Sequence, residues 1–131
     1  MKILVVDDQI ETTSMLSTFF HSKGLLCEVI NDSFEALERI QKENFDVILL
    51  DLCMPNFTGH QIIKTLATNE VLKDQNIFIF SSNLSHEFII KDLLRRDGIN
   101  GVLKKPMDLN KILMEITKGI DLEKSTTSET I

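Results

Sequence analysis

Four aliphatic residues in a row, Val47 to Leu50, lead directly into an acid, Asp51. A strand with one face in water alternates apolar and polar residues, and this run does not alternate. It therefore predicts a strand that is covered on both faces, as strands are in parallel sheets flanked by helices. An acid at the end of such a strand lies outside the apolar layer, where its carboxylate can stay solvated or meet a cation. The stretch favours an α/β fold and marks Asp51 as a candidate functional residue.

The same order of strand and helix recurs along the whole chain. Four further stretches predict strands, at Ile3–Val6, Cys27–Ile30, Ile77–Phe80 and Gly101–Leu103. Helical patterns of apolar residues follow the five strands in turn, at Met15, Leu16, Phe19 and Phe20; Phe34, Leu37 and Ile40; Ile62, Ile63 and Leu66; Phe88, Ile89 and Leu93; Leu109, Ile112, Leu113 and Ile116. Strands that alternate with helices indicate crossover connections, and hence a doubly wound five-stranded parallel sheet with five helices.

Capping residues predict where several of these helices begin and end. Asp32 with Glu35 forms an N-cap and capping-box signal, and Ser85 and Asp108 are N-cap candidates for the last two helices. The expected stops are Gly24 and Gly98.

Length and composition bound the class of protein. A chain of 131 residues predicts one domain, which we place at residues 1–118, with a polar and disordered tail at 119–131. The net charge of −6 argues against a nucleic-acid partner, because phosphate binding requires clustered cations. No apolar run approaches the ~18 residues of a membrane span, and no signal peptide is recognisable. Cys27 and Cys53 have no metal-type spacing, so we expect reduced thiols and a cytoplasmic location.

Polar residues follow four of the predicted strands, at the edge where ligands bind in open parallel sheets. Asp7 and Asp8 end the first strand, and Asp51 ends the third. If these strands are neighbours, three carboxylates converge, which is costly without a counter-charge. Mg²⁺ is the natural cation for such oxygen ligands, and Lys105 after the fifth strand is a second source of positive charge. Ser81 at the end of the fourth strand adds a hydroxyl donor.

This array of acid pair, acid, hydroxyl and lysine resembles the response regulator receiver domains of two-component signalling, of the chemotaxis-receiver type. The resemblance covers residues 1–118 and implies a flavodoxin-like sheet with strand order 2-1-3-4-5. It implies that Asp51 accepts a phosphoryl group and that Ser81 and Lys105 contact that group. It further implies that Mg²⁺ is held by Asp7, Asp8, Asp51 and the backbone carbonyl of Cys53.

The resemblance also implies a function. We expect a stand-alone receiver that takes its phosphoryl group from the phosphohistidine of a sensor histidine kinase or phosphotransfer protein. Such a receiver is not a conventional enzyme, since it catalyses only its own aspartyl phosphorylation and dephosphorylation. Phosphorylation would then switch binding to a downstream protein, with no nucleic-acid or membrane partner.

Receivers of this kind lead to two further expectations. The Lys105–Pro106 peptide bond should be cis, although cis bonds are only ~5–6% of X–Pro bonds in folded proteins. The fifth-strand position that often carries an aromatic residue is Val102, so the phosphorylated state should be transmitted differently. Two neighbouring positions, Ser82 and Met107, also depart from the common pattern.

Three alternatives remain open from the residues. The chain could be a receiver-like interaction module that is not phosphorylated, or the receiver part of a longer regulator. A small Mg²⁺-dependent phosphatase is less favoured, because Cys53 stands where such enzymes usually carry a second Asp. We assign no site to the three histidines, and we interpret Phe34 and Phe57 as core or loop anchors. No glycine-rich nucleotide loop is present.

Overall fold

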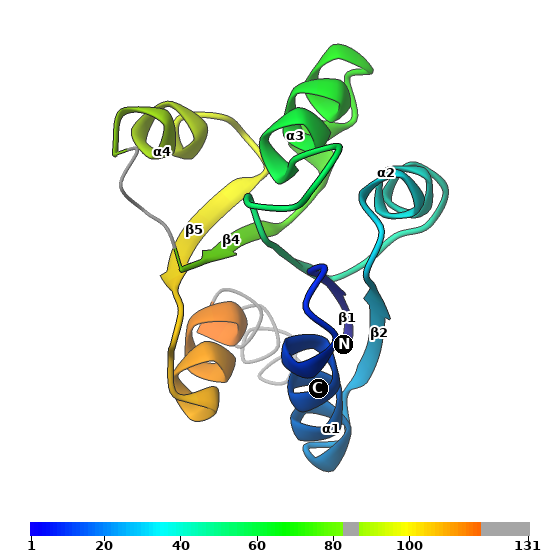
Figure 1. Ribbon diagram of the computed structural model, residues 1–131, viewed down its shortest axis with the longest axis vertical. Helices are drawn as coiled ribbons and strands as arrows, with labels where there is room; N and C mark the ends of the chain where they lie inside the picture. Colours follow the sequence, from blue (N-terminus) through cyan, green and yellow to red (C-terminus); the bar gives the residue numbers. More distant parts are fainter. Residues whose placement is uncertain (83–86, 119–131) are drawn as a thin grey trace, which may run out of the picture.

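Five parallel strands form one sheet in the order β2-β1-β3-β4-β5, which confirms the predicted order (Figure 1). The structure is a computed structural model and describes residues 1–82 and 87–118. The strands are β1 Lys2–Val6, β2 Leu26–Ile30, β3 Val47–Leu50, β4 Ile77–Ser81 and β5 Ile99–Lys104. The helices are α1 Ile10–Ser22, α2 Ser33–Lys42, α3 Gly59–Thr68, the short 3₁₀ helix η1 Leu72–Asp74, α4 Glu87–Leu94 and a C-terminal helix at residues 109–118.

Each face of the sheet carries its own hydrophobic core. In Figure 1, α2, α3 and α4 lie on one side of the strands, and α1 and the C-terminal helix lie on the other. Successive residues of a strand point to opposite faces, so Ile48 and Leu50 of β3 join the first core while Val47 and Leu49 join the second. All four are buried, which confirms that the unbroken aliphatic run is covered on both sides.

Two N-cap signals and the stop at Gly24 mark helix ends as predicted, whereas α4 ends at Leu94, before the predicted stop at Gly98. The side chain of Asp32 accepts a hydrogen bond from the Glu35 amide at 2.9 Å and so begins α2. Asp108 accepts from the Asn110 amide at 2.8 Å at the start of the C-terminal helix. Gly24 follows the end of α1 with φ +77°, a backbone conformation that glycine adopts without the usual side-chain clash.

Three predicted helix faces are wrong in part. Met15 is 49% exposed because α1 packs on the sheet through Thr13, Leu16 and Phe20, so a residue one position from Leu16 falls on the flank. Phe34 is 58% exposed instead of buried, because α2 turns Ser33, Ala36 and Ile40 inward. Ile89 of α4 is also exposed, while Leu93 is buried as predicted.

Two predictions concern residues outside the described ranges. They are the helix cap at Ser85 and the polar tail at 119–131. Within residues 1–82 and 87–118, no helix has the length and apolar character needed to cross a membrane.

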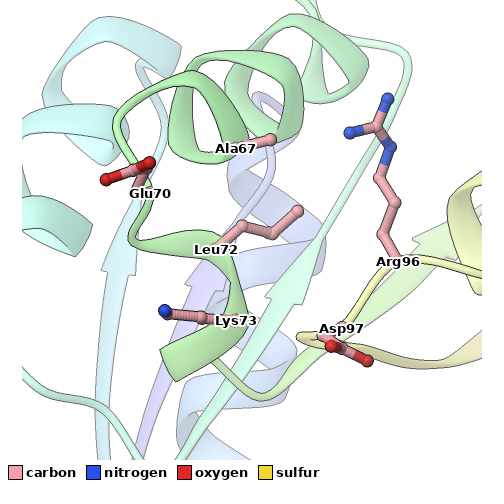
Figure 2. Close-up of a pocket in the computed structure, with 6 residues that line it drawn as sticks. All are labelled: Ala67, Glu70, Leu72, Lys73, Arg96 and Asp97. Carbon is pink, nitrogen blue, oxygen red and sulfur yellow. The ribbon is translucent and has the colours of Figure 1, made fainter.

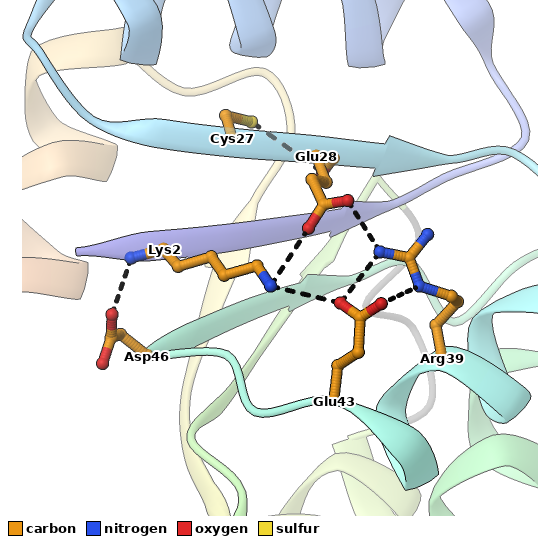
Figure 3. A network of polar contacts seen from close by, with 6 residues as sticks. All are labelled: Lys2, Cys27, Glu28, Arg39, Glu43 and Asp46. Carbon is orange, nitrogen blue, oxygen red and sulfur yellow. Dashed lines mark hydrogen bonds and ion pairs between the residues drawn. The ribbon is translucent and has the colours of Figure 1, made fainter.

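A network of ion pairs ties α2 to the amino-terminal part of the sheet (Figure 3). Arg39 donates to Glu28 at 2.6 Å and to Glu43 at 3.0 Å, and Lys2 Nζ lies 3.4 and 3.1 Å from the same two carboxylates. Lys2 Nζ also lies 4.8 Å from the centre of the Phe45 ring. The two cations and two carboxylates offset each other's charge, so the network links α2 to β1 and β2 through partly exposed ion pairs.

Candidate functional site

Three carboxylates meet at the carboxyl-terminal edge of the sheet. Asp7 and Asp8 follow β1, and Asp51 follows β3, which is the direct neighbour of β1 with Val6 in register with Leu50. A carboxylate oxygen from each of the three lies within 4.8 Å of the others. Asp7 and Asp51 are buried, and Asp8 is the more exposed member. The convergence that the sequence predicts is therefore confirmed.

Lys105 brings a positive charge to the same point from the end of β5. Its Nζ bonds to the Asp7 carboxylate and lies 3.6 Å from Asp51 Oδ2. The Lys105 amide donates to the Ser81 carbonyl at 3.0 Å, which joins the ends of β5 and β4. The Lys105–Pro106 peptide bond is cis, as predicted.

Burial sets the protonation behaviour of Asp51. Loss of hydration raises the pKa of the Asp51 carboxyl above its usual range, and the negative charges of Asp7 and Asp8 raise the pKa further. The Cys53 amide, which donates to Asp51 Oδ1 at 3.1 Å, and the Lys105 ammonium act in the opposite direction. A further cation beside Asp51 would favour its ionised form.

The loop after Asp51 is held close to the strand by a glycine. A Cβ at Gly59 would lie 2.2 Å from the Asp51 carbonyl oxygen, so any other residue would push α3 away from the end of β3. The Gly59 amide donates to Leu52 at 3.2 Å. Thr58 and Gln61 form a reciprocal capping box that begins α3. Thr-x-x-Gln is a capping-box pattern, so the sequence itself carries the signal for the start of α3.

Ser81 and Cys53 lie on the same edge and contact each other. Ser81 is fully buried at the end of β4, next to β3, and its Oγ lies 3.7 Å from Cys53 Sγ. The Cys53 side chain is exposed. The structure thus brings all the predicted site residues together: Asp7, Asp8, Asp51, Cys53, Ser81 and Lys105.

The donor set fits a hard divalent cation. Three carboxylates close together offer only oxygen ligands, which Mg²⁺ prefers. When all three are ionised, they carry three negative charges against the one positive charge of Lys105. The remaining two charges match those of a divalent cation. Asp7, Asp8 and Asp51 are therefore the residues that would hold such an ion.

An open pocket lies at the opposite edge of the sheet, between η1 and the connection from α4 to β5 (Figure 2). Its lining residues are Ala67, Glu70, Leu72, Lys73, Arg96 and Asp97. Two of the side chains are cationic and two are anionic, so the pocket has no net preference for an anion or a cation. The six predicted site residues do not line this pocket.

Comparison with known proteins identifies the family to which this site and fold correspond. A family model described as the response regulator receiver domain matches residues 3–117. A CpxR-homologous transcriptional regulatory protein of Haemophilus influenzae is 31% identical over 115 residues, which are 88% of this chain and 48% of that protein. The Escherichia coli sensor histidine kinase RcsC is 31% identical, over 89% of this chain and 12% of its own length. The chain thus spans about half or less of these two relatives.

A solved structure extends the comparison to the fold. The chemotaxis protein CheY4 of Vibrio cholerae is 32% identical, with a TM-score of 0.77 over 89% of this chain and 96% of that one. A 2-1-3-4-5 parallel sheet with an acidic cluster at its carboxyl-terminal edge defines a receiver-type α/β domain. The chain belongs to the response regulator receiver family, the receiver domains of two-component response regulators.

Proposed function

We propose that this receiver accepts a phosphoryl group on Asp51 from the phosphohistidine of a sensor histidine kinase or phosphotransfer protein. The observation that carries the proposal is the joint position of Asp51, the acid pair Asp7 and Asp8, and Lys105 at one sheet edge. Phosphoryl transfer depends on positioning and on neutralising charge more than on covalent help from the protein. These four side chains offer both.

In the proposed reaction a carboxylate oxygen of Asp51 attacks the phosphorus atom in line with the donor. The bond from phosphorus to the histidine nitrogen breaks, and its electron pair stays with the imidazole. The product is an acyl phosphate on Asp51. Lys105, now paired mainly with Asp7, would move its ammonium group toward the new phosphoryl oxygens, and the Ser81 hydroxyl would donate to another of them.

Asp7, Asp8, Asp51 and the backbone carbonyl of Cys53 would hold Mg²⁺. When bound, the ion offsets negative charge on the phosphoryl oxygens and between the carboxylates. An acyl phosphate is labile to water, so the domain would also catalyse its own dephosphorylation. It would act as a timed switch and not as a conventional enzyme with an external product.

We further propose that the phosphorylated state changes binding to a downstream protein in the cytoplasm. The net charge of −6 favours a protein partner over direct contact with nucleic acid. Two arrangements are compatible with this role: a stand-alone receiver, or the receiver part of a longer regulator. The greater length of the curated relatives favours testing both.

The proposal is tested by mass spectrometry after incubation with acetyl phosphate, with and without Mg²⁺. The expected result is one added phosphoryl group that depends on Mg²⁺ and is absent from Asp51→Asn, which keeps the shape of the side chain. Asp74→Asn, at an exposed acid on η1, is the matched control and should be phosphorylated like the parent. Phosphorylation of Asp51→Asn at the parent's rate would refute the assignment, and no phosphorylation of the parent would favour an interaction module.

A further inference from the structure

An aromatic pair connects α2 to the loop that follows Asp51. The rings of Phe34 and Phe57 are stacked, with centroids 4.8 Å apart and planes inclined by 15°. Phe34 is the second residue of α2, and Phe57 lies in the connection between β3 and α3. The contact therefore joins two segments that are far apart in the sequence and that meet beside the candidate site.

Phe57 is covered from two sides. It is partly buried and packs against the core between the sheet and α2 and α3. The Phe34 ring lies against it and is itself 58% exposed. An exposed phenylalanine on a helix gains little from burial, so its main described contact is the stack.

The described hydrogen bonds of this loop join residues that are close in the sequence. The Cys53 amide donates to Asp51, the Phe57 amide donates to Pro55 at 2.8 Å, and the Gly59 amide donates to Leu52. Such bonds shape the loop but do not join it to α2. Met54 anchors the middle of the loop in the core to which α2 contributes Ala36 and Ile40. The stack with Phe34 adds a second contact, to the first turn of α2, which the Asp32 cap begins.

We propose that Phe34 is a positioning residue for the loop at residues 52–58, which follows the candidate phosphoryl acceptor Asp51. By stacking on Phe57, it holds residues 52–58 so that the Cys53 backbone stays beside Asp51, where it would meet the cation. A loop that is already ordered binds an ion more tightly, because less conformational freedom is lost on binding. This inference rests on the proposed function, since it concerns the same Mg²⁺ site.

The first test is calorimetric titration of the full chain with MgCl₂. Phe34→Ala should weaken Mg²⁺ binding by about 3- to 10-fold, the range that the strength of an aromatic pair implies. Phe34→Tyr keeps the ring and should bind within about twofold of the parent. Met15→Ala removes a similarly exposed apolar side chain from α1 and is the matched control, with unchanged affinity expected.

The second test is the backbone NMR spectrum without Mg²⁺. Phe34→Ala should shift the Cys53 amide resonance, which reports the hydrogen bond to Asp51, and Phe34→Tyr should restore it. A purely structural role in α2 would move resonances within Ser33–Lys42 and leave the Cys53 resonance in place. Because Phe34 is exposed, Phe34→Ala is expected to fold, and circular dichroism checks this.

The outcomes separate the two proposals. If the parent binds no Mg²⁺, the proposed function fails and this inference fails with it. If the parent binds Mg²⁺ and Phe34→Ala binds it equally well, this inference alone is overturned.

Discussion

The ammonium group of Lys105 bonds to Asp7, and the carboxylate of Asp51 lies farther away, at 3.6 Å from the same nitrogen. The lysine therefore offsets the charge of Asp7 more than that of Asp51. Asp51, the candidate acceptor, has a pKa raised mainly by burial, and the more distant ammonium group offsets this only in part.

Lys105→Met should destabilise the metal-free protein at neutral pH. The Lys105 side chain is 12% exposed and the Asp7 side chain is 1% exposed, so the substitution leaves the buried Asp7 carboxylate without its partner. Breaking such a pair costs about 3 kcal/mol in the free energy of unfolding, measured by urea denaturation in EDTA. Lys104→Met, at the exposed neighbouring lysine, is the control and should cost little. Equal losses in the two variants would mean that the pair is unimportant for stability.

Asp51→Asn should stabilise the metal-free protein, and the gain should grow with pH. The folded-state pKa of Asp51 is raised, mainly by burial, so the unfolded chain ionises at lower pH than the folded one. The stability that the protonated carboxyl provides is full below the unfolded pKa of about 3.9 and is lost as pH rises through the folded value. Asparagine does not titrate and avoids this loss. Urea denaturation of both proteins between acid and neutral pH tests this, and a stability difference that does not change with pH would contradict it.

Mg²⁺ should raise the melting temperature of the parent protein, because ligand binding to the folded state alone stabilises that state. At a concentration tenfold above Kd the gain is about 1.4 kcal/mol, which corresponds to several degrees. Asp8→Ala should abolish the shift, since it removes one of the three clustered carboxylates. Asp74→Asn should retain it. Identical melting curves for the parent with and without millimolar Mg²⁺ would rule out the metal site.

Phosphorylation should change the surroundings of Asp51 and Ser81 more than the face built from α4, β5 and the C-terminal helix. Val102 is half-buried against the core under α4 and is stiff at its first torsion, so it cannot swing as a large ring does. Backbone NMR with beryllofluoride and Mg²⁺ measures the response. Val102→Phe should extend the shifts to α4. Shifts in residues 88–95 and 109–116 of the parent as large as those beside Asp51 would contradict the prediction.

The inner strands β1, β3 and β4 were predictable because burial on both faces leaves a direct imprint on the sequence. Each unbroken aliphatic run, such as Ile3–Val6, became a strand at the place expected. The helix faces were predicted less well. The spacing of apolar residues shows which side of a helix faces the sheet. How many residues on that side are buried depends on the packing partner, and so Met15 and Phe34 are exposed although they were predicted to be buried.

The candidate site was predictable at the level of which residues meet. Parallel strands end at one edge, so acids after β1 and β3 had to approach each other once those strands paired. The geometry within the cluster was not predictable. That Lys105 bonds to Asp7, that a Cβ at position 59 would strike the Asp51 carbonyl, and that Ser81 contacts Cys53 depend on distances between separate segments.

The sequence by itself determined the α/β class, the positions of the strands and the set of residues at the functional edge, because these follow from local patterns of apolar and charged side chains. The tertiary structure decided the pairing of Lys105, the raised pKa of Asp51 and the stacking of Phe34 on Phe57. These properties depend on burial and on separations of a few ångströms across the chain. Only the packing of the helices against the sheet sets those separations.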